Sequence, residues 1–330
     1  MKVKSLTIDY TGLSTYRLCP KKFQNLYIAR RSSLSPSDAL TFGSCIHRAL
    51  AVYHAGGSLG LVDVCDHNFK EFSDLSSTEY RIPHDCCRCR ALSTFAEEAK
   101  KTHLANLSAE TPRSIHHGLN LLWHYTRIYG PSHSTFIPTV NLDLKPNLEL
   151  KLTVPLCHIG DTELSYRGTI DGVVTETASG LTVGLEHKTT YYLNEAFLNR
   201  ARLNDQVTGY IYLLRESGIA PDLNTFVWNV LQTVTKKLQS SPGECFARTA
   251  TRRTEEQIFD WKTNTLATCR RILHDIEGGF FETNMPDGCT SWNSMCAFAD
   301  VCNAPSQERE GMLLSNYVEN TWDGIEVTYV

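Results

Sequence analysis

Apolar and polar residues alternate with the period of a strand in three neighbouring stretches of this chain. Residues 148–156 place an apolar side chain at every second position, and residues 163–171 and 181–188 continue the pattern. A turn at residues 179–180 joins the second and third stretches, so we expect a hairpin there. Residues 224–235 form a further apolar run that predicts a fourth strand.

Helical spacing replaces this alternation earlier in the chain. Apolar positions in residues 37–57 repeat at helical spacing and end at a Gly-Gly pair, which is typical of a helix C-terminus. From there to about Gly130 the chain predicts mostly helix, with polar breaks at residues 58–60 and 73–77.

Two more helices are expected in the second half. One begins with Asn194 as its N-cap and stops at Gly218. The last begins with a capping box, in which Gln257 follows Thr254 by three residues, and it extends to a Gly-Gly pair. This order of helices and strands predicts an α/β fold with a central mixed β-sheet flanked by helices.

Composition and charge narrow the class of protein only slightly. A hydrophobic fraction of 42% supports a packed core, and no apolar run approaches the length of a membrane span. The first ten residues lack the apolar region of a signal peptide, so we expect a cytoplasmic protein. The net charge of −4 neither favours nor excludes nucleic acid, because phosphate binding depends on local basic patches.

Acidic residues stand near the ends of both strands of the expected hairpin. Side chains alternate along a strand, so Glu186 and Lys188 share one face, and the turn brings Asp171 toward Glu186. Two facing carboxylates repel unless a cation lies between them. Oxygen ligands suit Mg²⁺ or Mn²⁺, and Lys188 beside such an ion would stabilise charge on a phosphate. On this stretch alone, a surface cluster of ion pairs is the alternative.

Four motifs, in this order, resemble those of the PD-(D/E)xK nuclease superfamily in its RecB-type branch, which includes CRISPR-adaptation nucleases and phage exonucleases. The family pattern is G-x-x-x-H on a helix, G-x-x-D at a strand end, E-x-K on the next strand and Q-x-x-x-Y on the following helix. The chain has GSCIH at 43–47, GTID at 168–171, EHK at 186–188 and QVTGY at 206–210. The resemblance extends from about residue 10 to residue 303.

This resemblance implies a restriction-endonuclease-like core and a role for each motif residue. Asp171, Glu186 and Lys188 would be catalytic. His47, Asp171, Glu186 and the backbone carbonyl of His187 would hold Mg²⁺ or Mn²⁺. From the residues of this helix alone, a packed core histidine is the favoured interpretation of His47.

Gln206 and Tyr210 are the DNA-binding residues that the resemblance implies. They are four residues apart and so lie on one helix face, where an amide and a phenol would contact the sugar–phosphate backbone or a base. Ordinary packing is the alternative for this pair, because the following residues are typical of a core.

The cysteines indicate a second site. Twelve cysteines in an expected cytoplasmic chain favour metal or cluster ligands over disulfides. Cys19 stands near the N-terminus, and Cys289, Cys296 and Cys302 follow one another near the C-terminus with the spacing C-x6-C-x5-C. Four thiolates accept either zinc or a 4Fe–4S cluster.

A subset of the RecB-type branch has this cysteine layout and holds a 4Fe–4S cluster, which implies an iron–sulfur staple joining the two termini. Many members have a shorter gap between the second and third cysteines, so zinc remains the less favoured occupant. A further group, Cys86, Cys87 and Cys89, follows His84 at a spacing that matches no metal site. We interpret this group as thiols that bind no metal.

These features predict a metal-dependent DNA nuclease, and we expect an exonuclease that acts on DNA ends with a preference for single strands. Its setting would be recombination, repair or phage DNA metabolism in a bacterial or phage-infected host. The sequence has no P-loop motif, so any helicase activity would come from a partner, and a recombination or annealing protein is another expected partner. A catalytically silent DNA-end-binding or scaffolding protein, and a zinc-stapled regulator, are the alternatives.

The same interpretation divides the chain into five segments. They are an N-terminal segment with the first cluster cysteine, a mostly helical insertion that carries the motif histidine, the nuclease core, a C-terminal cluster-binding segment and a tail, at residues 1–40, 41–145, 146–280, 281–305 and 306–330.

Overall fold

A mixed sheet of eight strands organises the part of the chain that the computed structural model describes, namely residues 2–34, 37–58, 86–130, 136–290, 295–321 and 324–329. Along the sheet the strand order is β10-β1-β5-β6-β7-β8, and β3 and β4 also pair with β5. The strands are β1 Val3–Ile8, β3 Phe136–Pro138, β4 Leu148–Ile159, β5 Thr162–Glu176, β6 Thr182–Thr190, β7 Thr225–Gln232, β8 Phe246–Arg252 and β10 Glu326–Tyr329. A separate pair joins β2 Arg31–Ser33 to β9 Tyr317–Glu319.

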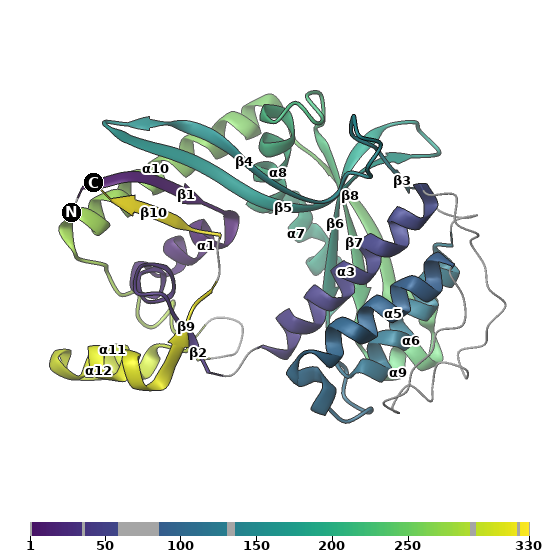
Figure 1. Cartoon of the computed structure of the whole chain (residues 1–330), viewed down its shortest axis with the longest axis horizontal. Helices are drawn as coiled ribbons and strands as arrows, with labels where there is room; N and C mark the ends of the chain where they lie inside the picture. Colours follow the sequence, from purple (N-terminus) through teal and green to yellow (C-terminus); the bar gives the residue numbers. More distant parts are fainter. Residues whose placement is uncertain are drawn as a thin grey trace.

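The long strand β5 connects the two halves of the molecule (Figure 1). β4 pairs with it antiparallel along most of its length. On the other edge, β1 pairs parallel with the beginning of β5, and β6 pairs antiparallel with its end. β7 joins β6 in parallel, and β8 follows antiparallel. The four strands expected from the alternation and the central mixed sheet are confirmed.

Helices cover the sheet and form two buried clusters with it. One cluster unites α1, α8 and α10 with β1, β4 and β5, and the other unites α3, α5 and α6 with the end of β7 and the start of β8. The helices are α1 Tyr10–Leu18, α2 Pro20–Phe23, α3 Asp38–Ser58, α5 Cys87–Lys100, α6 Ile115–Ile128, α7 Glu195–Leu203, α8 Asp205–Glu216, α9 Thr235–Ser240, α10 Glu255–Gly278, α11 Ala299–Asn303 and α12 Ser306–Asn316, with short turns η1 Gln24–Ile28, η2 His103–Asn106 and η4 Pro242–Cys245.

Several expected helix boundaries are confirmed. The Asn194 side chain accepts a hydrogen bond from the Phe197 amide at the start of α7 (2.8 Å), and Gly218 adopts φ 74° after α8. The capping box of Thr254 and Gln257 opens α10. The expected polar break at 73–77, most of the break at 58–60, and His84 lie outside the described residues.

The single helix expected between Asn194 and Gly218 is wrong, because α7 and α8 are separate helices that meet at Asn204. The Asn204 side chain accepts hydrogen bonds from the amides of Gln206 (2.8 Å) and Val207 (3.3 Å), which starts a new helix. The buried Arg253 guanidinium donates to the carbonyl of Asn204 (3.1 Å) and so satisfies the end of α7. The break sets the direction of α8 and hence of Gln206.

The N-terminal and C-terminal parts of the chain lie side by side (Figure 1). β10 pairs antiparallel with β1. The Lys21 amide donates to the Glu282 carbonyl (2.9 Å), and the Asn284 side chain donates to the Leu18 carbonyl (2.8 Å). Cys19 therefore lies against the segment that follows α10.

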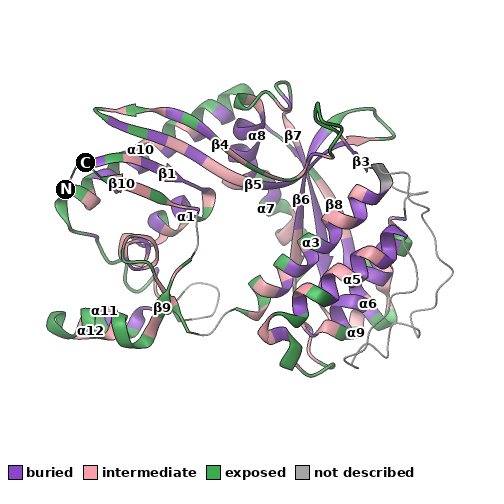
Figure 2. Cartoon of the chain, in the orientation of Figure 1, coloured by how far each residue is buried: buried purple, intermediate pink, exposed green. Residues whose placement is uncertain are grey.

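Burial singles out two carboxylates. β7 is buried along almost its whole length, whereas α12 has no buried residue (Figure 2). Among the described residues, the buried carboxylates are Asp9, Asp171 and Glu186. Asp9 is explained by its role as the N-cap of α1, where it accepts from the Gly12 amide (2.7 Å). Asp171 and Glu186 have no such role, so they mark the candidate site.

No described helix combines the length and the apolar character that a membrane crossing requires.

Candidate active site

Three carboxylates lie in a row across three adjacent strands. β4 and β5 pair Leu148 with Gly172, which places Glu149 across from Asp171. β5 and β6 pair Gly172 with Leu185, which places Glu186 across from Asp171 on the other side. Like charges at opposite positions on neighbouring strands destabilise a sheet. Such a row is therefore stable only with positive charge close to it.

A cleft of about 710 Å³ is lined by the three carboxylates together with side chains from α3, β6 and α8. The positively charged side chains of Arg48, Arg113 and Lys188 also line it. The cleft therefore joins a negative floor to positive walls. That distribution suits a cation held against the floor and a phosphate held between the walls.

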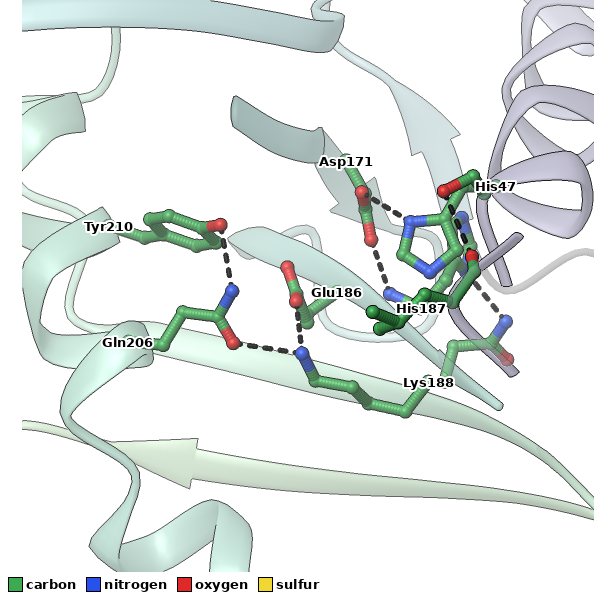
Figure 3. Close-up of polar contacts among 10 residues, drawn as sticks. His47, Asp171, Glu186, His187, Lys188, Gln206 and Tyr210 are labelled. Carbon is green, nitrogen blue, oxygen red and sulfur yellow. Dashed lines mark hydrogen bonds and ion pairs between the residues drawn. The ribbon is translucent and has the colours of Figure 1, made fainter. Parts of the chain in front are cut away.

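Asp171 is held ionised at the centre of the row. Its carboxylate contacts Nδ1 of His47 (2.9 Å) and accepts a hydrogen bond from the His187 amide (2.6 Å), as Figure 3 shows. Burial raises the pKa of Asp171, but the charge and hydrogen bond of His47 outweigh it and lower the pKa to about 2. Burial in turn lowers the pKa of His47, and Asp171 more than compensates, raising it to about 9.

Glu186 differs from Asp171 because only one of its oxygens has a partner. Oε1 accepts a hydrogen bond from Lys188 Nζ, whereas Oε2 is buried and has no hydrogen-bond partner among the described residues. Burial raises the pKa of Glu186 to about 7; Lys188 opposes this rise and Asp171 adds to it. A buried carboxylate oxygen without a partner is costly. The site therefore fits a cation at this oxygen.

Gln206 and Tyr210 complete a chain of contacts that positions Lys188 (Figure 3). Lys188 Nζ donates to the Gln206 amide oxygen (2.8 Å), and the Gln206 amide nitrogen donates to the Tyr210 hydroxyl (2.9 Å). Nζ also lies 5.5 Å from the ring centroid of Trp228. Tyr210 is buried, so this end of the chain is anchored in the core.

The glycines of two motifs allow close approach of neighbouring elements. A Cβ atom at Gly168 would lie 2.8 Å from the Tyr210 ring, so glycine lets α8 pack onto β5 beside Asp171. A Cβ atom at Gly43 would lie 3.3 Å from the Thr189 hydroxyl, where α3 meets the end of β6. These contacts bring His47 and Tyr210 to the carboxylate row from opposite directions.

The His187 side chain points away from Glu186, as the strand alternation predicts. Its ring is buried, contacts Asn229 (2.9 Å) and stacks on His54 with centroids 5.5 Å apart. Burial lowers the pKa of His187 well below its usual range, so the imidazole is neutral. Only the backbone of His187 faces the carboxylates.

Glu149 is a candidate ligand that the sequence analysis missed. One ligand atom from each of His47, Glu149 and Asp171 lies within 4.8 Å of the other two. Glu149 also has φ 49°, which a non-glycine residue adopts only at an energetic cost, and such strain concentrates at functional sites.

A β-bulge explains why Glu149 was missed. The turn after β4 pairs Ile159 with Thr162, and that register would place Leu150 across from Asp171. The register shifts by one residue between Pro155 and Cys157, which brings Glu149 to that position instead. A proline inside a strand is the one sequence signal of such a bulge.

The structure gathers the four cysteines of the expected cluster. Gly288 packs against Cys19, since a Cβ atom there would lie 3.0 Å from that of Cys19, and the Cys296 amide donates to the Cys289 carbonyl (2.7 Å). Burial raises the pKa of the Cys302 thiol, and the neighbouring thiols of Cys19, Cys296 and Cys289 raise it further. No three sulfurs of the described cysteines lie within 4.8 Å of one another.

Cys86, Cys87 and Cys89 are buried at the start of α5, away from these four. The Cys86 sulfur accepts a hydrogen bond from the Cys89 amide (3.4 Å) and caps the helix. All three belong to the buried cluster around α3 and α6, so they contribute to its packing.

A mixed sheet that presents three carboxylates, a histidine and a lysine to one cleft has the construction of a metal-dependent nuclease. The family model of the PD-(D/E)XK nuclease superfamily matches residues 8–303, so the chain belongs to that superfamily. Among solved structures it is similar to a "Putative exonuclease" from Eubacterium rectale, at 12% identity and a TM-score of 0.46, over 90% of this chain and 87% of that one. No curated protein matches the sequence.

Proposed function

We propose that this protein is a DNA exonuclease that hydrolyses phosphodiester bonds at DNA ends, with a preference for single strands. The observation that carries the proposal is the carboxylate row with Lys188 in one cleft, where Glu186 keeps a buried oxygen without a partner. The nuclease fold implies DNA as the substrate. A helicase and a recombination or annealing protein are the partners that fit this activity.

His47, Asp171, Glu186 and the backbone carbonyl of His187 would hold Mg²⁺ or Mn²⁺, with Glu149 as a further ligand. The unpartnered oxygen of Glu186 supports this assignment. A bound divalent ion supplies polarisation of the scissile phosphate and lowers the pKa of water. Asp171 is ionised and so available for ligation, since its pKa is lowered to about 2. His47 would release its proton on ligating the ion, because a ligating imidazole is neutral.

Lys188 is proposed to stabilise the negative charge that develops on the phosphate. Gln206 and Tyr210 hold Nζ at the edge of the carboxylate row, so the cation is in place before the substrate arrives. Arg48 and Arg113 on the cleft wall would contact flanking phosphates. Gln206 and Tyr210 would reach DNA from the same edge.

For the second site we propose a structural 4Fe–4S cluster held by Cys19, Cys289, Cys296 and Cys302. The layout of one cysteine before the nuclease core and three after it supports a cluster over zinc, because it is the layout of the cluster-binding subset that the sequence resembles. The cluster would join the N-terminal segment to the segment after α10, and hydrolysis of phosphate needs no redox step from it.

Incubation of the pure protein with end-labelled single-stranded and duplex DNA tests the function. We expect mononucleotides or short products with Mg²⁺ or Mn²⁺ and no products with EDTA. Binding of DNA ends without cleavage in every metal would instead identify a silent end-binding protein. The contact between Lys188 and Glu186 argues against that alternative, because binding alone does not need a lysine beside paired carboxylates.

Replacing Glu149 with Gln should weaken Mn²⁺ binding. A ligand that faces the ion should matter at least as much as an outer-shell partner, whose loss costs roughly 10–100-fold in affinity. Titration followed by the electron paramagnetic resonance signal of free Mn²⁺ measures this directly. The exposed Glu163 on the same sheet provides the control, since Glu163→Gln should bind Mn²⁺ normally. Unchanged binding in Glu149→Gln would remove Glu149 from the site.

Replacing Glu186 with Gln should stabilise the metal-free protein at alkaline pH. The pKa of Glu186 rises from 4.5 to about 7 on folding, so the folded state holds a proton that the unfolded state has released. The resulting loss in the free energy of unfolding is absent below pH 4.5, grows as the pH rises and is complete above about pH 7. We therefore expect the Tm of Glu186→Gln to exceed that of the parent by several degrees at pH 8 and to match it near pH 4, in EDTA. An equal difference at both pH values would contradict the assigned titration.

A further inference from the structure

Two adjacent tyrosines project from the rim of the cleft. Tyr191 and Tyr192 follow the end of β6, three and four residues after Lys188. Tyr191 is 45% exposed and lines the cleft, and Tyr192 is 70% exposed. Their rings contact each other edge to face, with centroids 5.0 Å apart and planes at 78°. Large aromatic rings so exposed beside a polar cleft are a feature to be explained.

The backbone beneath these rings is anchored to the neighbouring strand. The Gln232 side chain donates to the Tyr191 carbonyl (2.9 Å), and the Thr233 amide donates to the Thr190 carbonyl (2.8 Å). The Thr190 hydroxyl also accepts from the Tyr192 amide (3.2 Å). The rings are thus exposed without belonging to a loose loop. An anchored aromatic side chain has only two side-chain torsions to order, so it binds a flat ligand at low entropic cost.

The surroundings of the tyrosines match the chemistry of a nucleic-acid strand. Leu40 on α3 is 75% exposed and lines the same cleft as Tyr191, so the cleft also offers an apolar side chain. Lys188, Arg48 and Arg113 supply positive charge for the phosphates. Every nucleobase has a flat face that stacks on aromatic rings, but bases within a duplex are already stacked on one another. The combination favours unpaired bases with a phosphate between them.

We propose that Tyr191 and Tyr192 form a stacking platform for the unpaired bases next to the scissile phosphate, and that this platform selects single-stranded DNA ends. The proposal rests on the proposed nuclease function and names the part of the site that recognises the substrate. The platform orients the strand so that a phosphate enters the carboxylate row beside Lys188. It binds bases of any identity, because stacking does not read hydrogen-bonding edges.

Binding of a fluorescent oligonucleotide tests the platform. The full-length protein in EDTA is mixed with single strands that carry 2-aminopurine in the terminal positions, and with the matching blunt duplex. Stacking quenches 2-aminopurine, so the parent protein should quench the single strand. Tyr191→Ala and Tyr192→Ala should each weaken single-strand binding by about tenfold and remove most of the quenching. Each Tyr→Phe variant should retain both properties.

Two controls separate stacking from a general defect. Phe259 is 68% exposed on α10, which contributes no described residue to the cleft lining, so Phe259→Ala should bind like the parent. Binding of the blunt duplex should be unchanged in the tyrosine variants. Their loss of single-strand affinity should stay constant as salt increases, since stacking releases no counterions, whereas phosphate contacts weaken with salt.

The outcomes distinguish the platform from the nuclease function. If the parent cleaves DNA but the Tyr191→Ala/Tyr192→Ala double variant, folded with the parent Tm, binds and quenches single strands normally, the platform is wrong and the nuclease stands. If the parent neither cleaves nor binds any DNA, the proposed function fails and the platform fails with it. Equal losses on single strands and duplex would also overturn the platform, because they indicate a general DNA contact.

Discussion

Asp171→Asn should lower the rate of DNA cleavage by about a thousandfold or more. Asp171 stands between Glu149 and Glu186, so its charge faces any ion held by the row. Loss of the ion removes several kcal/mol of transition-state stabilisation, and each 1.36 kcal/mol changes a rate tenfold. The amide is close to the carboxylate in shape, so the fold should persist. Single-turnover cleavage of an end-labelled strand in saturating Mn²⁺ measures the rate.

The exposed Asp222 offers a matched substitution outside the cleft, and Asp222→Asn should cleave at the parent rate. Circular dichroism and Tm establish that Asp171→Asn is folded. Mn²⁺ binding should fall together with the rate. Cleavage within a few fold of the parent, in a folded Asp171→Asn protein, would exclude Asp171 from the chemistry and with it the proposed metal site.

Alanine at Cys19 should abolish the brown colour that we expect of protein purified without oxygen. The four cysteines would hold about four irons per chain, and loss of one thiolate leaves the cluster incomplete. Cys289→Ala, Cys296→Ala and Cys302→Ala should behave in the same way, with iron lost and solubility and activity reduced. Iron analysis and the visible absorption spectrum provide the measurement. We expect a large effect because a cluster held by these cysteines would join segments far apart in the chain, Cys19 after α1 and the others after α10.

Cysteines outside the group serve as the comparison. Cys89 and Cys245 are buried in the cluster around α3 and α6, so alanine at either position should leave colour and iron content unchanged. A colourless parent protein with one zinc per chain would replace the cluster by zinc and retain the four-thiolate site. Full iron occupancy in Cys19→Ala would refute Cys19 as a ligand.

The parts of the site that depend on local sequence were predictable. Glu186 and Lys188 share a face because side chains alternate along β6, and the short turn between β5 and β6 fixes which residue lies across from Asp171. Periodicity, turn residues and spacing all act within about twenty residues here. The hairpin and the positions of Asp171 and Glu186 in it can therefore be predicted from the local sequence, without knowledge of any distant contact.

Other features depend on contacts that the sequence does not display. The apolar residues around Asn204 have the spacing of one continuous helix. The Asn204 side chain caps a new helix instead, and Arg253, far along the chain, supports this break by donating to the Asn204 carbonyl. β1 and β10 are short strands, with β10 at the edge of the sheet and β1 between β10 and β5, and each depends on pairing with a segment distant in sequence. Local patterns therefore predicted β4 to β7 and missed these strands.

The bulge in β4 makes the identity of the residue facing Asp171 a matter of register. Straightening the bulge at constant chain length would place Leu150 across from Asp171, whereas deleting the extra residue near Leu156 would keep Glu149 there, and neither change alters a motif. The number of residues between this carboxylate and the G-x-x-D motif therefore varies with the bulge. A sequence alignment would then place equivalent carboxylates of two relatives in different columns. Comparisons among divergent relatives should count residues from Asp171 across the sheet, strand to strand, and not along the chain.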